Sequence, residues 1–183
     1  IADYMHDYKT GRDTYYFYGS VEYSEGIRAA TADTDDEMVR SAISRSATFD
    51  NNNLRSETFY DITGEKGEER NAYTYNYKTD GKDIRNTTVY AYESDGDRET
   101  QRMRRTDTYK GKIADISDID VTANPLQSAT YYNLEERSDG TKIEKGDEIA
   151  DYMHDYKTGR DTYYFYGSVE YSEGIRAATA DTD

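Results

Sequence analysis

One block of this chain occurs twice. Ile1–Asp35 and Ile149–Asp183 are identical in sequence, and the two segments are offset by 148 residues. Self-similarity at a fixed period is typical of repeat architectures. We therefore predict a tandem array in which residues 1–148 form one full repeat unit and residues 149–183 start the next, identical unit.

The composition limits the kind of core that such a unit can build. The chain carries a net charge of -15, and leucine occurs only at Leu54, Leu126 and Leu134. A low apolar content with a high net charge is typical of disordered chains. However, the 21 tyrosines and the single proline favour β-structure. We expect a thin, tyrosine-lined core whose order depends on neighbouring copies or on metal.

The spacing of aromatic residues predicts strands. Tyr73, Tyr75 and Tyr77 alternate with Thr74 and Asn76, which places aromatic and polar side chains on opposite faces of a strand. Asp-Gly pairs, which suit tight hairpin turns, follow at regular intervals. The pattern predicts an all-β fold of serial antiparallel strands and hairpins in an elongated tandem-repeat architecture. The three Asp-Gly turns are Thr79-Asp80-Gly81, Ser94-Asp95-Gly96 and Ser138-Asp139-Gly140.

One segment allows two interpretations. Met38, Val39, Ala42 and Ile43 have helical spacing, and the acidic residues before them would favour the first turn of a helix. The alternative is a strand whose inward side carries Val39, Ser41 and Ile43.

The aromatic residues are the candidate packing surface within and between units. Tyrosine combines a large contact area with a hydrogen-bonding hydroxyl, so a partly exposed row also suits self-association. A platform that stacks on sugar rings is the alternative. The candidates are Tyr4, Tyr15, Tyr16, Phe17, Tyr18, Tyr73, Tyr75, Tyr77, Tyr90, Tyr92, Tyr131 and Tyr132.

Acidic clusters suggest calcium, which takes six to eight oxygen ligands. The alternative is a solvated acidic edge that prevents unwanted strand pairing. The Asn86-Thr87-Thr88 tripeptide matches the N-glycosylation pattern at Asn86. The candidate metal ligands are Asp33, Asp35, Asp36, Asp115, Asp118 and Asp120.

Several function classes are disfavoured. The negative charge opposes binding to nucleic acid, which requires clustered Lys and Arg. The chain has no cysteine and no apolar run long enough to span a bilayer. His6 and its copy His154 are not part of a recognisable catalytic motif. We expect no enzyme activity. We expect identical copies of the chain as partners, and glycans are a second candidate.

The tyrosine and glycine spacing resembles the YD repeats of RHS-type proteins. Tyr60-Asp61-Ile62-Thr63-Gly64 matches the motif of Tyr-Asp, two residues and Gly. Tyr77-Lys78-Thr79-Asp80-Gly81 and Tyr92-Glu93-Ser94-Asp95-Gly96 keep the spacing but lack the Asp after Tyr. The resemblance implies β-hairpins that spiral into a shell or tube, which in that family encloses a toxin.

Together these features predict a structural segment of a long extracellular or cell-surface protein that assembles into a fibre, stalk or filament. Two alternatives remain: an adhesin repeat that binds calcium or carbohydrate, and an RHS-like toxin shell.

Overall fold

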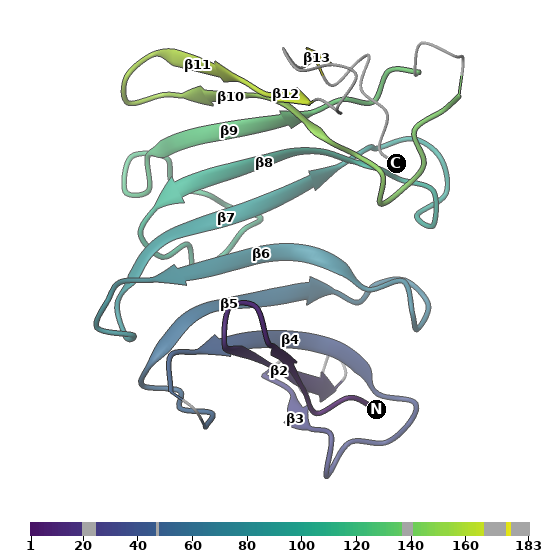
Figure 1. Ribbon diagram of the computed structural model, residues 1–183, viewed down its shortest axis with the longest axis vertical. Helices are drawn as coiled ribbons and strands as arrows, with labels where there is room; N and C mark the ends of the chain where they lie inside the picture. Colours follow the sequence, from purple (N-terminus) through teal and green to yellow (C-terminus); the bar gives the residue numbers. More distant parts are fainter. Residues whose placement is uncertain (20–24, 47, 137–140, 167–174, 177–183) are drawn as a thin grey trace. The chain divides into compact units, whose positions relative to one another are not determined.

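The computed structural model describes residues 1–19, 25–46, 48–136, 141–166 and 175–176, and these contain strands and no helix. The all-β, antiparallel prediction is therefore confirmed. Figure 1 labels all of these strands except β1. They are β1 (Tyr4–Asp7), β2 (Arg12–Gly19), β3 (Ile27–Arg28), β4 (Glu37–Ser44), β5 (Leu54–Asp61), β6 (Arg70–Tyr77), β7 (Ile84–Tyr92), β8 (Met103–Lys110), β9 (Leu126–Tyr132), β10 (Ala150–Asp155), β11 (Arg160–Tyr163), β12 (Phe165–Tyr166) and β13 (Ile175–Arg176).

The strands follow one another in the sheet almost as they do in the chain. Hydrogen-bonded neighbours have the order β1-β2-β4-β5-β6-β7-β8-β9-β10-β11, β3 pairs with β2, and β12 and β13 form a separate pair. The chain divides into two compact units. The first contains residues 1–89 and 110–119, and the second contains residues 90–109 and 120–183. The second copy of the repeated block begins at Ile149, inside the second unit and between β9 and β10.

In the first unit, one face of the sheet carries the aromatic side chains. Tyr15 and Phe17 are buried with Ala42 and Leu54, and Phe49 packs against this cluster. Further along the same face, Phe59 of β5 stacks on Tyr73 of β6, and their ring centroids lie 4.7 Å apart. Aromatic and β-branched cross-strand pairs stabilise a sheet in this way.

The opposite face carries hydroxyl side chains. Thr58 and Thr74 are register partners on β5 and β6, and their hydroxyl oxygens lie 2.9 Å apart. Ser41 of β4 lies within hydrogen-bonding distance of the Tyr60 hydroxyl, at 3.0 Å. The alternation that the sequence shows at Tyr73–Tyr77 therefore separates an aromatic face from a hydroxyl face.

A segment after β8 covers part of the aromatic face of the first unit. Ile113 is buried, and its carbonyl accepts a hydrogen bond of 2.6 Å from the Tyr75 hydroxyl. The fully buried Thr87 hydroxyl donates to the Gly111 carbonyl at 2.7 Å and accepts from the Ile113 amide at 3.1 Å. Tyr75 thus gains both burial and a partner for its polar atom.

The segment with two interpretations is a strand. β4 pairs with β2 on one side and with β5 on the other, so tertiary pairing on both edges outweighs the helical spacing of its apolar residues. Val39 and Ser41 are buried as the strand interpretation expects, and Ile43 is half-buried. Ala42 and Ser44 on the other face are also buried.

The Asp-Gly pairs lie in longer loops than the tight hairpins expected. Residues 78–83 separate β6 from β7, and residues 93–102 separate β7 from β8. The loops lengthen because they make tertiary contacts: the Gly81 carbonyl, for example, accepts a hydrogen bond of 2.9 Å from the Leu54 amide. Gly81 and Gly96 do have the positive φ angles, 71° and 83°, that the pattern indicates. Gly140 is outside the described residues.

Candidate functional site

The structure places the candidate packing residues at three levels of exposure. Only one of them, Tyr4, is exposed, and it lies on β1. Tyr15, Phe17, Tyr18 and Tyr75 are buried. The half-buried members are Tyr16, Tyr73, Tyr77, Tyr90, Tyr92, Tyr131 and Tyr132.

The two copies of the repeated block form the same hairpin. In the first copy Tyr4 pairs with Tyr15 across β1 and β2, and in the second copy Tyr152 pairs with Tyr163 across β10 and β11. His6 lies 2.6 Å from Asp13, and His154 lies 2.6 Å from Asp161. The repeated block therefore forms a hairpin with the same strand register in both copies.

The turn of this hairpin is also conserved between the copies. The Asp7 carboxylate accepts hydrogen bonds from the Thr10 hydroxyl and from the Lys9 and Thr10 amides, and these bonds hold the pKa of Asp7 below its ordinary value. Asp155 accepts the equivalent amide bonds, and its pKa is lowered chiefly by the bond from the Thr158 amide.

The two hairpins differ in what lies beside their first strand. Among the described strands, β1 pairs only with β2, whereas β10 also pairs with β9. Tyr152 stacks on Tyr131 of β9 with ring centroids 4.6 Å apart and an angle of 11° between the ring planes. Tyr4 and Met5 are 57% and 51% exposed, whereas their copies Tyr152 and Met153 are half-buried.

The hairpins also differ in what lies beside their second strand. β2 pairs with β4, where Tyr15 lies opposite Ala42 and is 6% exposed. Its copy Tyr163, on β11, is 46% exposed. Each copy of the hairpin thus shows a neighbouring strand on one side: β4 beside the first copy and β9 beside the second.

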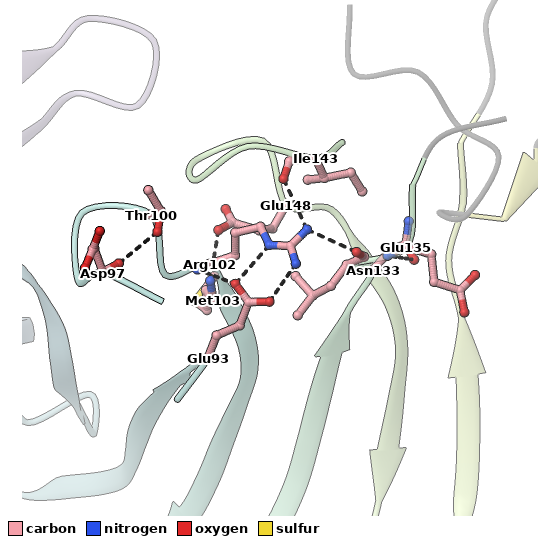
Figure 2. Close-up of polar contacts among 10 residues, drawn as sticks. Glu93, Asp97, Thr100, Arg102, Met103, Asn133, Glu135, Ile143 and Glu148 are labelled. Atoms are coloured by element: carbon pink, nitrogen blue, oxygen red, sulfur yellow. Dashed lines mark hydrogen bonds and ion pairs between the residues drawn. The ribbon is translucent and has the colours of Figure 1, made fainter. Parts of the chain in front are cut away.

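A polar clamp in the second unit holds three segments together. Figure 2 shows the Arg102 guanidinium between the Glu93 carboxylate and two backbone carbonyls. Its Nη2 and Nε atoms donate to Glu93 at 2.6 and 2.9 Å, and Nη1 donates to the carbonyls of Leu134 and Ile143 at 3.0 and 3.2 Å. The Arg102 side chain lowers the pKa of Glu93 through these hydrogen bonds.

Arg102 lines an open depression of about 800 Å³ in the second unit, together with acidic and basic side chains that include Glu99, Lys142 and Lys145. Glu148 extends the clamp, because its carboxylate accepts from the Met103 amide at 2.9 Å and from the Gly146 amide at 2.8 Å. These contacts tie the segment that precedes the second copy to β8.

Sequence reasoning missed this clamp and two further charged contacts. Glu57 is 6% exposed and bonds to both Arg40, at 2.7 Å, and the Tyr77 hydroxyl. Arg28 donates to Asp3 at 2.8 and 2.5 Å. The sequence does not indicate which charged residues pair, because the chain has many acidic residues and the partners become neighbours only through the strand register.

The acidic candidates for calcium binding lie in turns. Asp36 accepts a hydrogen bond from the Asp33 amide, Asp115 accepts from Ser117, and Asp120 accepts from the Thr122 amide. Asp35 and Asp118 are exposed. In the described part of the chain, no three acidic or histidine side chains converge as a possible metal site.

Asn86 lies within β7 rather than in a loop, opposite Asn76 of β6. Its side chain is half-buried, and its Oδ1 atom is buried without a hydrogen-bond partner. The tripeptide that matches the N-glycosylation pattern thus lies on a strand of the sheet, and glycosylation at Asn86 stays a prediction.

Comparison of the chain with protein-family models, with curated proteins and with solved structures found no match. Among the described residues there is no helix of the length and hydrophobicity that a membrane span requires.

Proposed function

We propose that the chain is a structural segment of a tandem-repeat protein, in which successive repeats extend one antiparallel sheet to form an extracellular or cell-surface fibre or stalk. The observation that carries this proposal is the pairing of β10 with β9. β9 belongs to the first 148 residues and β10 to the repeated block, so the sheet continues across the repeat boundary.

The two hairpin copies together supply both neighbours that an internal repeat needs. The second copy has β9 beside its first strand, and the first copy has β4 beside its second strand. Because the hairpins are identical in sequence and register, an internal hairpin flanked by both strands requires no new type of contact.

The energetics also support assembly by repetition. The hairpin on β1 leaves Tyr4 largely exposed, and the same tyrosine in the second copy packs on β9. Stacked repeats that bury surface only against their neighbours are stabilised by nearest-neighbour interfaces. A chain with few aliphatic residues therefore gains stability as copies are added.

The test is to compare this chain with chains into which one and two further 148-residue repeats have been inserted. Neighbouring strands lie about 4.8 Å apart, so each repeat, with eight described ladder strands from β1 to β9, adds about 35–40 Å to the sheet. Small-angle scattering is expected to show this constant increase in the longest dimension. A longest dimension that grows only as the cube root of the mass would contradict the proposal.

A further inference from the structure

A basic depression lies in the first unit of this strongly acidic chain. It has a volume of about 530 Å³ and lies where β5 and β7 begin and β6 ends. The chain has 38 acidic and 23 basic residues, yet the charged side chains among the described residues that line the depression are all basic. They belong to Arg45, Arg55, Lys78 and Arg85. A surface that gathers cations in this way is expected to attract anions.

Two β-bulges place arginines at this depression. Arg55 of β5 lies between the pairing partners of two consecutive β4 residues, so it is the extra residue of a bulge. Arg85 has the same position in β7, because its two neighbours pair with the consecutive residues Asn76 and Tyr77 of β6. A bulge bends the strand locally and changes the direction of a side chain. Both arginine side chains line the depression.

The other two cations already have partners within the chain. Lys78 forms an ion pair with Asp83 at 2.9 Å. The Arg45 guanidinium donates to two backbone carbonyls, at 3.2 and 3.1 Å. The pKa of Asp80 is lowered chiefly by hydrogen bonds from two backbone amides, and the positive charges of Lys78 and Arg45 lower it further. These two cations are therefore partly compensated by acidic residues of the loop between β6 and β7.

Arg55 and Arg85 are the cations that remain available to a ligand. Both residues are exposed, and neither side chain forms a hydrogen bond or an ion pair with another described residue. β5 and β7 lie on either side of β6, so the two strands are about 10 Å apart. Long arginine side chains on these strands reach one anion that lies over β6, and each presents paired N–H donors to its oxygens.

The remaining lining residues favour a small polar ligand. Ser56, Asn76 and Thr79 provide hydroxyl and amide groups that form hydrogen bonds with ligand hydroxyls. A volume of about 530 Å³ is typical of small-molecule sites. The net charge of -15 opposes a long polyanion, which would extend over acidic surface, and therefore favours a compact anion.

We propose that this depression binds a sugar that carries a sulfate or phosphate ester. The ester oxygens accept hydrogen bonds from Arg55 and Arg85, and the sugar hydroxyls bond to Ser56, Asn76 and Thr79. The two esters share a tetrahedral oxyanion, which arginine recognises in either case. All five residues lie in the first unit, so the inference does not depend on the proposed fibre.

The test titrates the full 183-residue chain with glucose 6-sulfate, glucose 6-phosphate, glucose, inorganic sulfate and inorganic phosphate. Two-dimensional NMR is expected to show saturable shifts of the Ser56, Asn76 and Thr79 amides, with a Kd below about 1 mM for one or both esters. Glucose and the inorganic ions each lack one half of the ligand and are expected to bind at least about tenfold more weakly. The ester that binds more tightly identifies the group that the site prefers.

Variants of the chain locate the site. Arg55→Ala and Arg85→Ala each remove one charged donor and are expected to weaken binding of the tighter ester about tenfold. Both side chains are exposed and form no hydrogen bond or ion pair in the described part of the chain, so neither change is expected to unfold it. Arg104→Ala removes the same charge from an exposed residue of β8 and is the control, which is expected to bind as the parent chain does.

Absence of binding by both esters at millimolar concentration would overturn the inference. Equal affinity for glucose or for an inorganic ion would refute the assignment to a sugar ester. A loss of binding in Arg104→Ala that matches the loss in Arg55→Ala and Arg85→Ala would show a general effect of charge and would refute the site.

Discussion

Tyr131 and Tyr152 stack nearly parallel where β9 meets the second copy of the repeated block, with ring centroids 4.6 Å apart. The copy of Tyr152 in the first block is Tyr4, which instead contacts Tyr15 at 5.8 Å in a tilted arrangement and remains 57% exposed. One residue of the repeat thus has two environments in one molecule, which makes the contribution of the junction measurable.

Substitution of these two tyrosines separates the stack from the hairpin. Tyr152→Ala removes the stack on Tyr131 as well as the contact with Tyr163, whereas Tyr4→Ala removes only the equivalent hairpin contact. We expect Tyr152→Ala to lower the free energy of unfolding by about 1–2 kcal/mol more than Tyr4→Ala does. Urea denaturation of both variants measures this difference. Equal losses would show that the stack adds nothing.

The Arg102 clamp makes a second prediction. Arg102→Ala leaves the Glu93 carboxylate and the carbonyls of Leu134 and Ile143 without their shared donor. We expect a loss of about 2–4 kcal/mol and faster hydrogen exchange in residues 141–148. Arg104→Ala, an exposed change on β8 two residues after Arg102, is the control and is expected to cost little. A matching loss in the control would contradict a specific role for the clamp.

The same clamp has a defined pH dependence. Arg102 lowers the pKa of Glu93, so the clamp stabilises the fold fully above the ordinary glutamate value of 4.5 and loses this contribution as the pH falls through the lowered pKa. We expect Glu93→Gln to be less stable than the parent chain at pH 7 and to approach it below about pH 4. Urea denaturation across this range tests the sign. A stability difference that grows toward low pH would exclude this role of Glu93.

Gly81 provides a backbone prediction. Its φ is 71°, and a Cβ added there would lie 2.6 Å from the Asn53 Cα. Gly11 has a similar φ of 65°, but no atom within 4 Å of an added Cβ. We expect Gly11→Ala to cost about 1 kcal/mol for conformation alone, and Gly81→Ala to cost at least about 2 kcal/mol because backbone must also move. Thermal denaturation compares the two, and equal costs would show that the approach of Asn53 is easily relieved.

The sequence predicts the strands better than it predicts what surrounds them. Alternation at Tyr73–Tyr77 predicts β6 and its aromatic face, because side-chain direction in a strand is a local property. The spacing of Met38–Ile43 could not decide between helix and strand, because the pairing of β4 on both edges is a tertiary effect. Likewise, no local signal distinguishes Tyr4 from Tyr152, since their sequences are identical and only β9 makes them differ.

The candidate packing surface, too, can be predicted only in part, because its contacts depend on which strands pair. The repeated block and the tyrosines of the junction can be read from the sequence, including Tyr131 and Tyr4. The sequence does not identify β9 as the neighbour of β10, because nothing in the uncharged segment 121–133 indicates which strand it pairs with. The contacts of Glu57 and Arg102 depend on strand register and on a loop that returns to β8.

Hydrogen exchange of the two identical strands tests the continuity of the sheet most directly. The segments Tyr4–Tyr8 and Tyr152–Tyr156 have the same sequence and hence the same intrinsic exchange rates, and they yield the same peptide in mass spectrometry. If β9 pairs with β10 and leaves the outer edge of β1 open, that peptide is expected to show two separate isotope envelopes. The β10 copy is protected at His154 and Tyr156, whereas the β1 copy exchanges faster at His6 and Tyr8. A single envelope, at either rate, would contradict the pairing on which the fibre proposal depends.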